Sequence, residues 1–202
     1  APAAMSHTTT TVGIAMVLST FLGTAALVYA VIALMTAMSS MLHHGTATEA
    51  APPLMIVVPL MTILGILLMR QDHALHVTFG AHGTAGETMV FLARFVSVQV
   101  LFLLLGLTVM TRQGYFRDFV FGTKTSPGSY ALVCPGVAFQ VMMFFFIHKG
   151  LVAADVLTKF SPAYWALIAV ALASQAAMIA LVLRLNRQHF ARAARAPAVP
   201  AE

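Results

Sequence analysis

The segment from Ser126 to Phe146 reads SPGSYALVCPGVAFQVMMFFF and contains no charged residue. A helix that crosses a membrane needs about 20 mostly apolar residues, and this segment meets that requirement. It also contains Pro135, which has no backbone N–H to donate within a helix. The residue before it, Cys134, is the only cysteine of the sequence. The segment therefore predicts a membrane-spanning helix that carries a proline and a single thiol.

The composition of the whole chain indicates an integral membrane protein. Of its 202 residues, 60% are hydrophobic and 8% are charged. Soluble domains carry about 25% charged residues, so this chain has too few of them to cover a surface exposed to water. A single cysteine excludes an intramolecular disulfide and a cysteine-rich metal site.

Five segments are long and apolar enough to span a membrane. The first contains no Lys, Arg, Asp or Glu, and the third contains one charged residue, Arg94, near its start. We therefore predict an all-α integral membrane protein with a transmembrane helical domain at residues 1–194 and a disordered tail at 195–202. The predicted helices cover about residues 12–38, 53–69, 88–110, 130–147 and 162–183.

The distribution of Lys and Arg predicts an orientation, because cytoplasmic loops are richer in these residues. With a cytoplasmic C-terminus, seven basic residues lie inside and four lie outside. This favours an outer N-terminus and a cytoplasmic C-terminus, in a bacterial inner (plasma) membrane. The inner residues are Arg112, Arg117, Lys124, Arg184, Arg187, Arg192 and Arg195, and the outer ones are Arg70, Arg94, Lys149 and Lys159.

Two of the predicted helices, the second and the fourth, contain an internal proline, Pro59 and Pro135. An internal proline removes one backbone hydrogen bond and kinks the helix. In a membrane the freed carbonyl needs a partner from protein or water, which favours a position that faces a neighbour or a cavity. Proline is also commoner in membrane helices than in soluble ones, so packing is the alternative explanation for each proline.

Eight histidines could supply ligands, because neutral imidazole is the commonest metal ligand. His73 and His76 are three residues apart and would share one helix face. None of the eight lies near the middle of a predicted span, which favours solvated histidines at the membrane surface over a metal or haem site. For Arg94 the alternatives are an ion path and a side chain that extends to the lipid headgroups; its position near a helix end favours the second.

Motifs for hydrolysis, phosphate binding or dinucleotide binding are absent from the sequence. Asp and Glu occur outside the five predicted spans, which argues against a proton-driven pump whose coupling acid lies in this chain. We therefore predict that the protein is not an enzyme, needs no cofactor or metal, and does not bind nucleic acid.

Four features, in order along the chain, resemble the tellurite-resistance/dicarboxylate transporter family, which includes the slow-type anion channels of plants. The first is a proline-rich start of a helix, APPLMIVVPL at 51–60. A later helix ends in RQGYFRDF at 112–119, and the segment YALVCP follows at 130–135. Last, the loop KGLVAADV at 149–156 leads to a final helix and a basic tail.

The resemblance is to the C-terminal half of the family's fold. Family members are similar to a ring of ten helices, arranged as five hairpins, whose odd-numbered helices line a central pore and are kinked at prolines. This chain would supply helices six to ten, so its second and fourth spans would face the path. The residues that the resemblance implies for the path are Pro59, Thr62, Tyr130, Cys134, Pro135, Ala138 and Phe139.

Two departures from the family pattern affect this interpretation. Half of the ring is absent from the sequence, so a missing N-terminal half, a partner subunit or a homo-oligomer would complete the pore. In the plant channels a phenylalanine immediately before the proline of the ninth helix occludes the pore, whereas Cys134 has that position here. The gate is then absent or supplied elsewhere, for example by Phe139.

The resulting hypothesis is a membrane channel or transporter for small anions, inorganic or carboxylate, in contact with membrane lipid. Helix-end dipoles and kinked backbone, rather than fixed charges, would attract the anion. One alternative is a membrane-anchor or cytochrome-b-like subunit of a respiratory complex, which a Soret absorption band would reveal. Another is an accessory subunit without a path, in which the two prolines shape packing.

Overall fold

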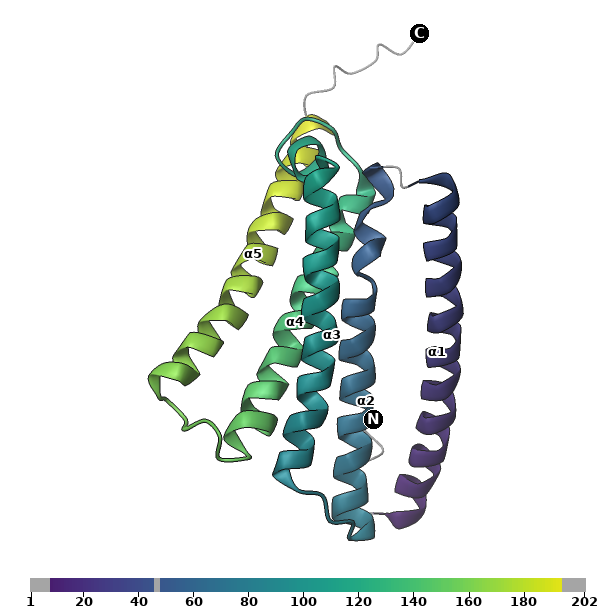
Figure 1. Cartoon of the computed structure of the whole chain (residues 1–202), viewed down its shortest axis with the longest axis vertical. Helices are drawn as coiled ribbons and strands as arrows, with labels where there is room; N and C mark the ends of the chain where they lie inside the picture. The colour runs from purple at the N-terminus through teal and green to yellow at the C-terminus, as the bar shows by residue number, and fades with distance from the viewer. Residues whose placement is uncertain (1–7, 46–47, 194–202) are drawn as a thin grey trace.

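The computed structural model describes residues 8–45 and 48–193, and the regular structure of these residues is helical. Five of its helical spans are long and apolar enough to cross a membrane, as the sequence predicted. The predicted tail at 195–202 lies outside the described residues. The main helices are α1 (Thr9–His44), α2 (Val57–Phe79), α3 (Ala85–Arg112), α4 (Val133–Phe145) and α5 (Pro162–Ala193) (Figure 1).

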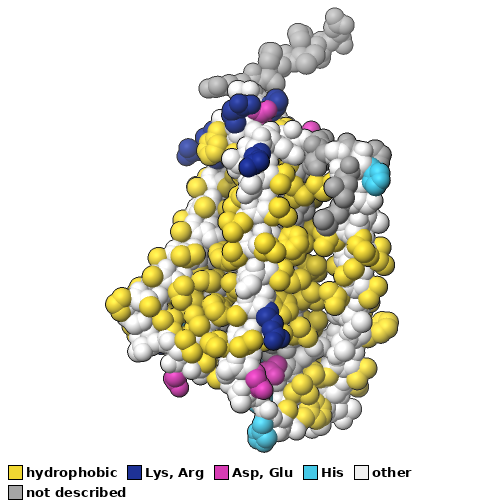
Figure 2. All heavy atoms as spheres, viewed as in Figure 1, with side chains coloured by type: hydrophobic (Ala, Val, Ile, Leu, Met, Phe, Trp, Pro, Cys, Tyr) yellow, Lys and Arg dark blue, Asp and Glu magenta, His cyan; other side chains and the backbone are white. Residues whose placement is uncertain are grey.

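Helices α2, α3 and α4 contact one another and form the centre of the bundle. Helix α1 packs on α2, and α5 packs on α4, so that α1 and α5 flank the central three (Figure 1). Consecutive helices are antiparallel, so α1, α3 and α5 end where the spans of α2 and α4 begin. Most basic side chains gather at this end, and hydrophobic side chains cover the middle of the bundle (Figure 2). We call it the arginine-rich end.

The spans of α2 and α4 begin in the same way. Each starts with a 3₁₀ helix, Pro52–Met55 in one and Pro127–Leu132 in the other, and changes to an α-helix after it. Pro59 and Pro135 are the third residues of α2 and α4. Each proline therefore lies in the first turn of its α-helix, just after the change from 3₁₀ to α-helical structure, rather than in the middle of the α-helix.

Some helix boundaries also differ from the expectation. Helix α2 continues past Arg70 to Phe79 and ends at Gly80, whose φ of 66° lies in the left-handed region that favours glycine. Most of residues 70–87, which lie between the second and third predicted helices, are therefore helical. Helix α3 starts with a capping box, in which Thr84 Oγ1 accepts from Glu87 N and Thr84 N donates to Glu87 Oε2.

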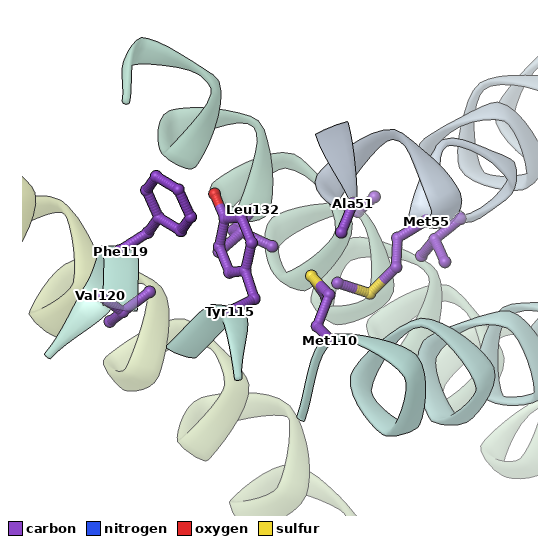
Figure 3. Close-up of a cluster of buried hydrophobic side chains, with 9 residues drawn as sticks. Ala51, Met55, Met110, Tyr115, Phe119, Val120 and Leu132 are labelled. Carbon is purple, nitrogen blue, oxygen red and sulfur yellow. The ribbon is translucent and has the colours of Figure 1, made fainter. Parts of the chain in front are cut away.

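The largest buried cluster lies at the arginine-rich end, where the two 3₁₀ segments meet. It includes Met55 from the first segment and Ala51 just before it, Leu132 from the second, and Met110 and Tyr115 from the end of α3 and the turn after it (Figure 3). The Tyr115 hydroxyl lies 2.9 Å from Ser129 Oγ, so this buried aromatic has a polar partner. The cluster fixes the starts of α2 and α4 relative to each other.

Helix α1 is attached to the bundle mainly through its first half. Val12 packs against Ala74, and Gln71 Nε2 donates to Ser19 Oγ at 2.8 Å. Beyond these contacts most apolar side chains of α1 are exposed, for example Tyr29 at 75%. In a membrane such a surface contacts lipid or another protein.

Candidate functional site

A buried group of uncharged polar atoms joins the three central helices. Gln99 of α3 is fully buried, and its Nε2 donates to Thr62 Oγ1 at 2.6 Å and to the Val58 carbonyl at 2.9 Å. Thr62 Oγ1 donates in turn to the Ala138 carbonyl of α4 at 2.8 Å. We call these four residues, Val58, Thr62, Gln99 and Ala138, the Thr62–Gln99 node.

The node lies next to both prolines in sequence. Thr62 follows Pro59 by three residues, and Ala138 follows Pro135 by three. Hydrogen bonds between membrane helices contribute about 0.6 to 2 kcal/mol each, because the polar groups would otherwise lie in hydrocarbon. The Oε1 atom of Gln99 is buried and has no hydrogen-bond partner among the described residues. The node therefore holds α2, α3 and α4 together and retains one free acceptor.

Replacing Thr62 with valine tests the node directly. Valine has nearly the same shape, but it donates nothing to the Ala138 carbonyl and accepts nothing from Gln99 Nε2. We expect the free energy of unfolding in detergent to fall by about 1–3 kcal/mol, the usual effect of leaving buried polar groups unpaired. The matched control is Thr108→Val, because the exposed Thr108 hydroxyl bonds only to its own helix, at Leu104 O. An equal loss in both variants would contradict this role of the node.

The α2–α4 pair has one uncovered side. Helix α3 covers one side through Gln99, α1 contacts α2 near Gln71, and α5 contacts α4 at Gly136. Side chains at helical spacing on the remaining side are exposed or half-buried, with Ile63 at 66% and Val137 at 42%. This α2–α4 open face consists of Ile56, Pro59 and Ile63 on one helix and Cys134, Val137 and Val141 on the other.

The structure divides the seven residues predicted for the path into two groups. Cys134 is exposed and Pro59 is half-buried, and both belong to the α2–α4 open face. The other five lie between helices: Thr62 and Ala138 in the node, Pro135 buried in the first turn of α4, Phe139 half-buried against both large hydrophobic clusters, and Tyr130 against α5. The structure thus brings Thr62 and Ala138 into contact, but it buries both between the helices rather than on the α2–α4 open face.

Helix α4 and the 3₁₀ segment before it are joined to α5 by further uncharged polar contacts. Tyr130 Oη donates to Asn186 Oδ1 at 2.8 Å, and Gln140 Nε2 donates to Gln175 Oε1 at 3.0 Å. Ser174 Oγ donates to the Gly136 carbonyl at 3.0 Å. Gln99, Gln140 and Gln175 were not among the residues predicted for the site, although an amide within an apolar span is itself a signal of an interhelical contact.

Histidines lie at both ends of the bundle. His148 Nδ1 lies 3.0 Å from the Phe144 carbonyl, and His148 Nε2 lies 3.2 Å from Tyr164 Oη. His76 Nε2 accepts a hydrogen bond from Gly83 N. Among residues 8–45 and 48–193, no three His, Cys, Asp or Glu side chains are grouped so that they could hold a metal ion.

In the described residues, the fold is all-helical, with five helices long and apolar enough to span a membrane and a neutral polar node between the three central ones. No known protein family, curated protein or solved structure matches the chain.

Proposed function

We propose that this protein is a membrane channel or transporter subunit for small anions, inorganic or carboxylate, and that the α2–α4 open face forms part of the wall of the path. The single observation that carries the proposal is the exposure of this face. Helices α2 and α4, which share the Thr62–Gln99 node with α3, leave uncovered the side that carries Cys134 and Pro59.

Electrostatics supports an anion rather than a cation. The open face carries no acidic side chain. Helices α2 and α4 both begin at the arginine-rich end, so the positive ends of their dipoles point toward that mouth. Arg112, at the end of α3, is exposed at the same end and would raise the local concentration of anions.

The proposal includes an orientation and a partner. The excess of Lys and Arg at the arginine-rich end supports a cytoplasmic location for that end in a bacterial inner membrane, with the start of α1 outside. The open face provides one side of a path, so the other side comes from a second copy, a partner subunit or a segment outside this sequence. A flux experiment therefore requires the complete assembly.

The unique thiol provides the test. The assembly is reconstituted in liposomes and treated with a small, anionic, membrane-impermeant methanethiosulfonate, and labelling of Cys134 is read by intact mass. We expect labelling of the folded protein and a fall in chloride or nitrate efflux, because the attached group would narrow the path. Cys134→Ser should keep its efflux and should not respond to the reagent.

A lipid-facing thiol is the matched control. Leu104→Cys, made in the Cys134→Ser background, places a thiol on an exposed position of α3, which lies on the other side of the α2–α4 pair. The anionic reagent should not label this thiol in liposomes. If Cys134 reacts only after denaturation, or if both thiols react equally, the open face does not line a water-filled path.

A further inference from the structure

A cleft with basic and apolar walls lies at the arginine-rich end, away from the α2–α4 open face. Its volume is about 480 Å³. It lies between the last part of α5 and the turn that follows the π-helical segment Phe116–Val120. Its lining residues are Gly122, Ala180, Leu183, Arg184, Arg187 and Gln188.

Direct hydrogen bonds hold the wall of this cleft in place. Arg184 Nε donates to the Val120 carbonyl at 2.6 Å, and Arg184 Nη2 donates to the Phe121 carbonyl at 3.0 Å. Gln188 Nε2 donates to the carbonyls of Gly122 and Lys124, at 3.2 and 2.7 Å. A side chain at Gly122 would overlap the backbone of the preceding turn, so the tight turn requires glycine. The cleft is therefore defined by fixed backbone.

The positive charge of the cleft is not balanced by nearby carboxylates. Asp118 is within ion-pair distance of Lys124 at 2.7 Å and of Arg117 at 3.4 Å. The hydrogen bond from Lys124 holds the pKa of Asp118 below its usual range, so this carboxylate stays ionised and paired with Lys124 and Arg117. Within the described part of the chain, neither Arg184 nor Arg187 forms an ion pair with a carboxylate.

The two arginines are three residues apart and share one helix face. The bonds of Arg184 to neutral carbonyls use two of its five N–H donors and leave its charge in place. Arginine binds phosphate through two parallel hydrogen bonds, and a guanidinium pair can take one phosphate between them. The cleft thus has the donors and the charge that a phosphate group requires.

The apolar wall indicates that this phosphate belongs to a lipid. On α5 the side chains change from apolar to basic between Leu183 and Arg184, as expected at the boundary between hydrocarbon and headgroups. Leu183 is 55% exposed, Ile179 is 55% exposed and Phe121 is 67% exposed, so an acyl chain would find apolar surface directly below the arginines. Basic pockets between membrane helices bind anionic headgroups in this way.

We propose that the cleft binds an anionic phospholipid, with its phosphate between Arg184 and Arg187 and an acyl chain along Leu183 and Ile179. A zwitterionic lipid brings its own cation to the same position, so it should bind less well. The site is separate from the proposed path, and its occupancy does not depend on transport.

The test is native mass spectrometry of the full chain in detergent with phosphatidylglycerol or phosphatidylcholine of the same acyl composition. We expect the chain to retain phosphatidylglycerol in preference to phosphatidylcholine. Arg187→Gln should lower the association constant for phosphatidylglycerol about fivefold, the effect of one basic residue at a membrane surface. The Arg187 side chain is exposed and lines the cleft without bonding to the turn that forms its other wall, so this variant should keep its structure.

Arg112→Gln is the matched control, because Arg112 is exposed at the same end but does not line the cleft. It should leave the retained phosphatidylglycerol unchanged. An equal loss in Arg112→Gln, or equal retention of the two lipids by the unmodified chain, would overturn the proposal in favour of a diffuse surface charge. Displacement of the lipid by millimolar inorganic phosphate would also overturn it, because the cleft would then be a site for a soluble anion.

Discussion

Replacing Gln99 with glutamate should destabilise the protein by about 3–5 kcal/mol at pH 8, the usual effect of an unpaired charge in a buried position. The side chain of Gln99 is fully buried, and its Nε2 donates to two acceptors. An ionised carboxylate cannot donate to the Val58 carbonyl, so it would face an oxygen without a proton between them. The shape of the side chain is almost unchanged, so the loss reports charge and hydrogen bonding rather than volume.

The loss of stability in Gln99→Glu should increase as the pH rises. Burial raises the native-state pKa of a carboxyl above the unfolded value of about 4.3. Well below pH 4.3 the glutamate is protonated in both states, and its single O–H can replace one of the two hydrogen bonds that Gln99 Nε2 donates. As the pH rises above 4.3, the unfolded state loses the proton first, and stability falls by about 1.4 kcal/mol per pH unit until the native pKa is reached.

Thermal unfolding in detergent between pH 5 and pH 8 measures this effect, with Gln99→Met as the control. Methionine has a similar shape and carries no charge, and it also removes the unpartnered Oε1 atom. We expect a loss of about 1–3 kcal/mol, because Val58 O and Thr62 Oγ1 lose the Gln99 donor, with no pH dependence beyond that of the unmodified protein. A flat pH response of Gln99→Glu would mean that water reaches the Thr62–Gln99 node.

Replacing Gly136 with leucine should have the second large effect, a loss of about 3 kcal/mol from overpacking between α4 and α5. A Cβ atom at Gly136 would overlap the side chain of Met178, including its Cγ and Sδ atoms. The larger side chain would separate the two helices and weaken the bond from Ser174 Oγ to the Gly136 carbonyl, now 3.0 Å long. Denaturant unfolding in detergent would show a lower midpoint.

Two further variants separate overpacking from helix propensity. Gly86→Leu adds the same side chain where nothing lies within 4 Å of the new Cβ, and it should leave the midpoint nearly unchanged. Combining Gly136→Leu with Met178→Ala restores space at the contact and should recover part of the loss. If the double variant is no more stable than Gly136→Leu, the clash with Met178 is not the cause.

Much of the fold could be predicted from the sequence, because the charged residues lie almost entirely outside the apolar spans. All five spans are present, but their ends follow local backbone chemistry rather than charge. Helix α2 passes through Arg70 and Asp72, which extend from the helix without ending it, and stops at Gly80. The sequence also does not show that Pro59 and Pro135 occupy first turns, because a 3₁₀ segment and an α-helix have similar apolar patterns.

The candidate site was predicted less completely, for a geometrical reason. Thr62 and Ala138 were both predicted to line a path, and the structure places them in a hydrogen bond between α2 and α4. Which side of α2 and α4 faces a neighbour, however, depends on where α3 packs, and the nearly uniform apolar composition of these spans does not indicate it. Gln99 was the available signal, since a fully buried amide in a membrane helix needs partners on another helix.

The neutrality of the Thr62–Gln99 node has an electrical consequence. Moving one elementary charge across the membrane potential is worth about 2.3 kcal/mol per 100 mV. The node consists of amide, hydroxyl and carbonyl groups, so its rearrangement would carry no formal charge through the field. A change in membrane voltage therefore does almost no work on the contact that joins α2, α3 and α4, and voltage sensitivity in the assembly would have to come from other residues.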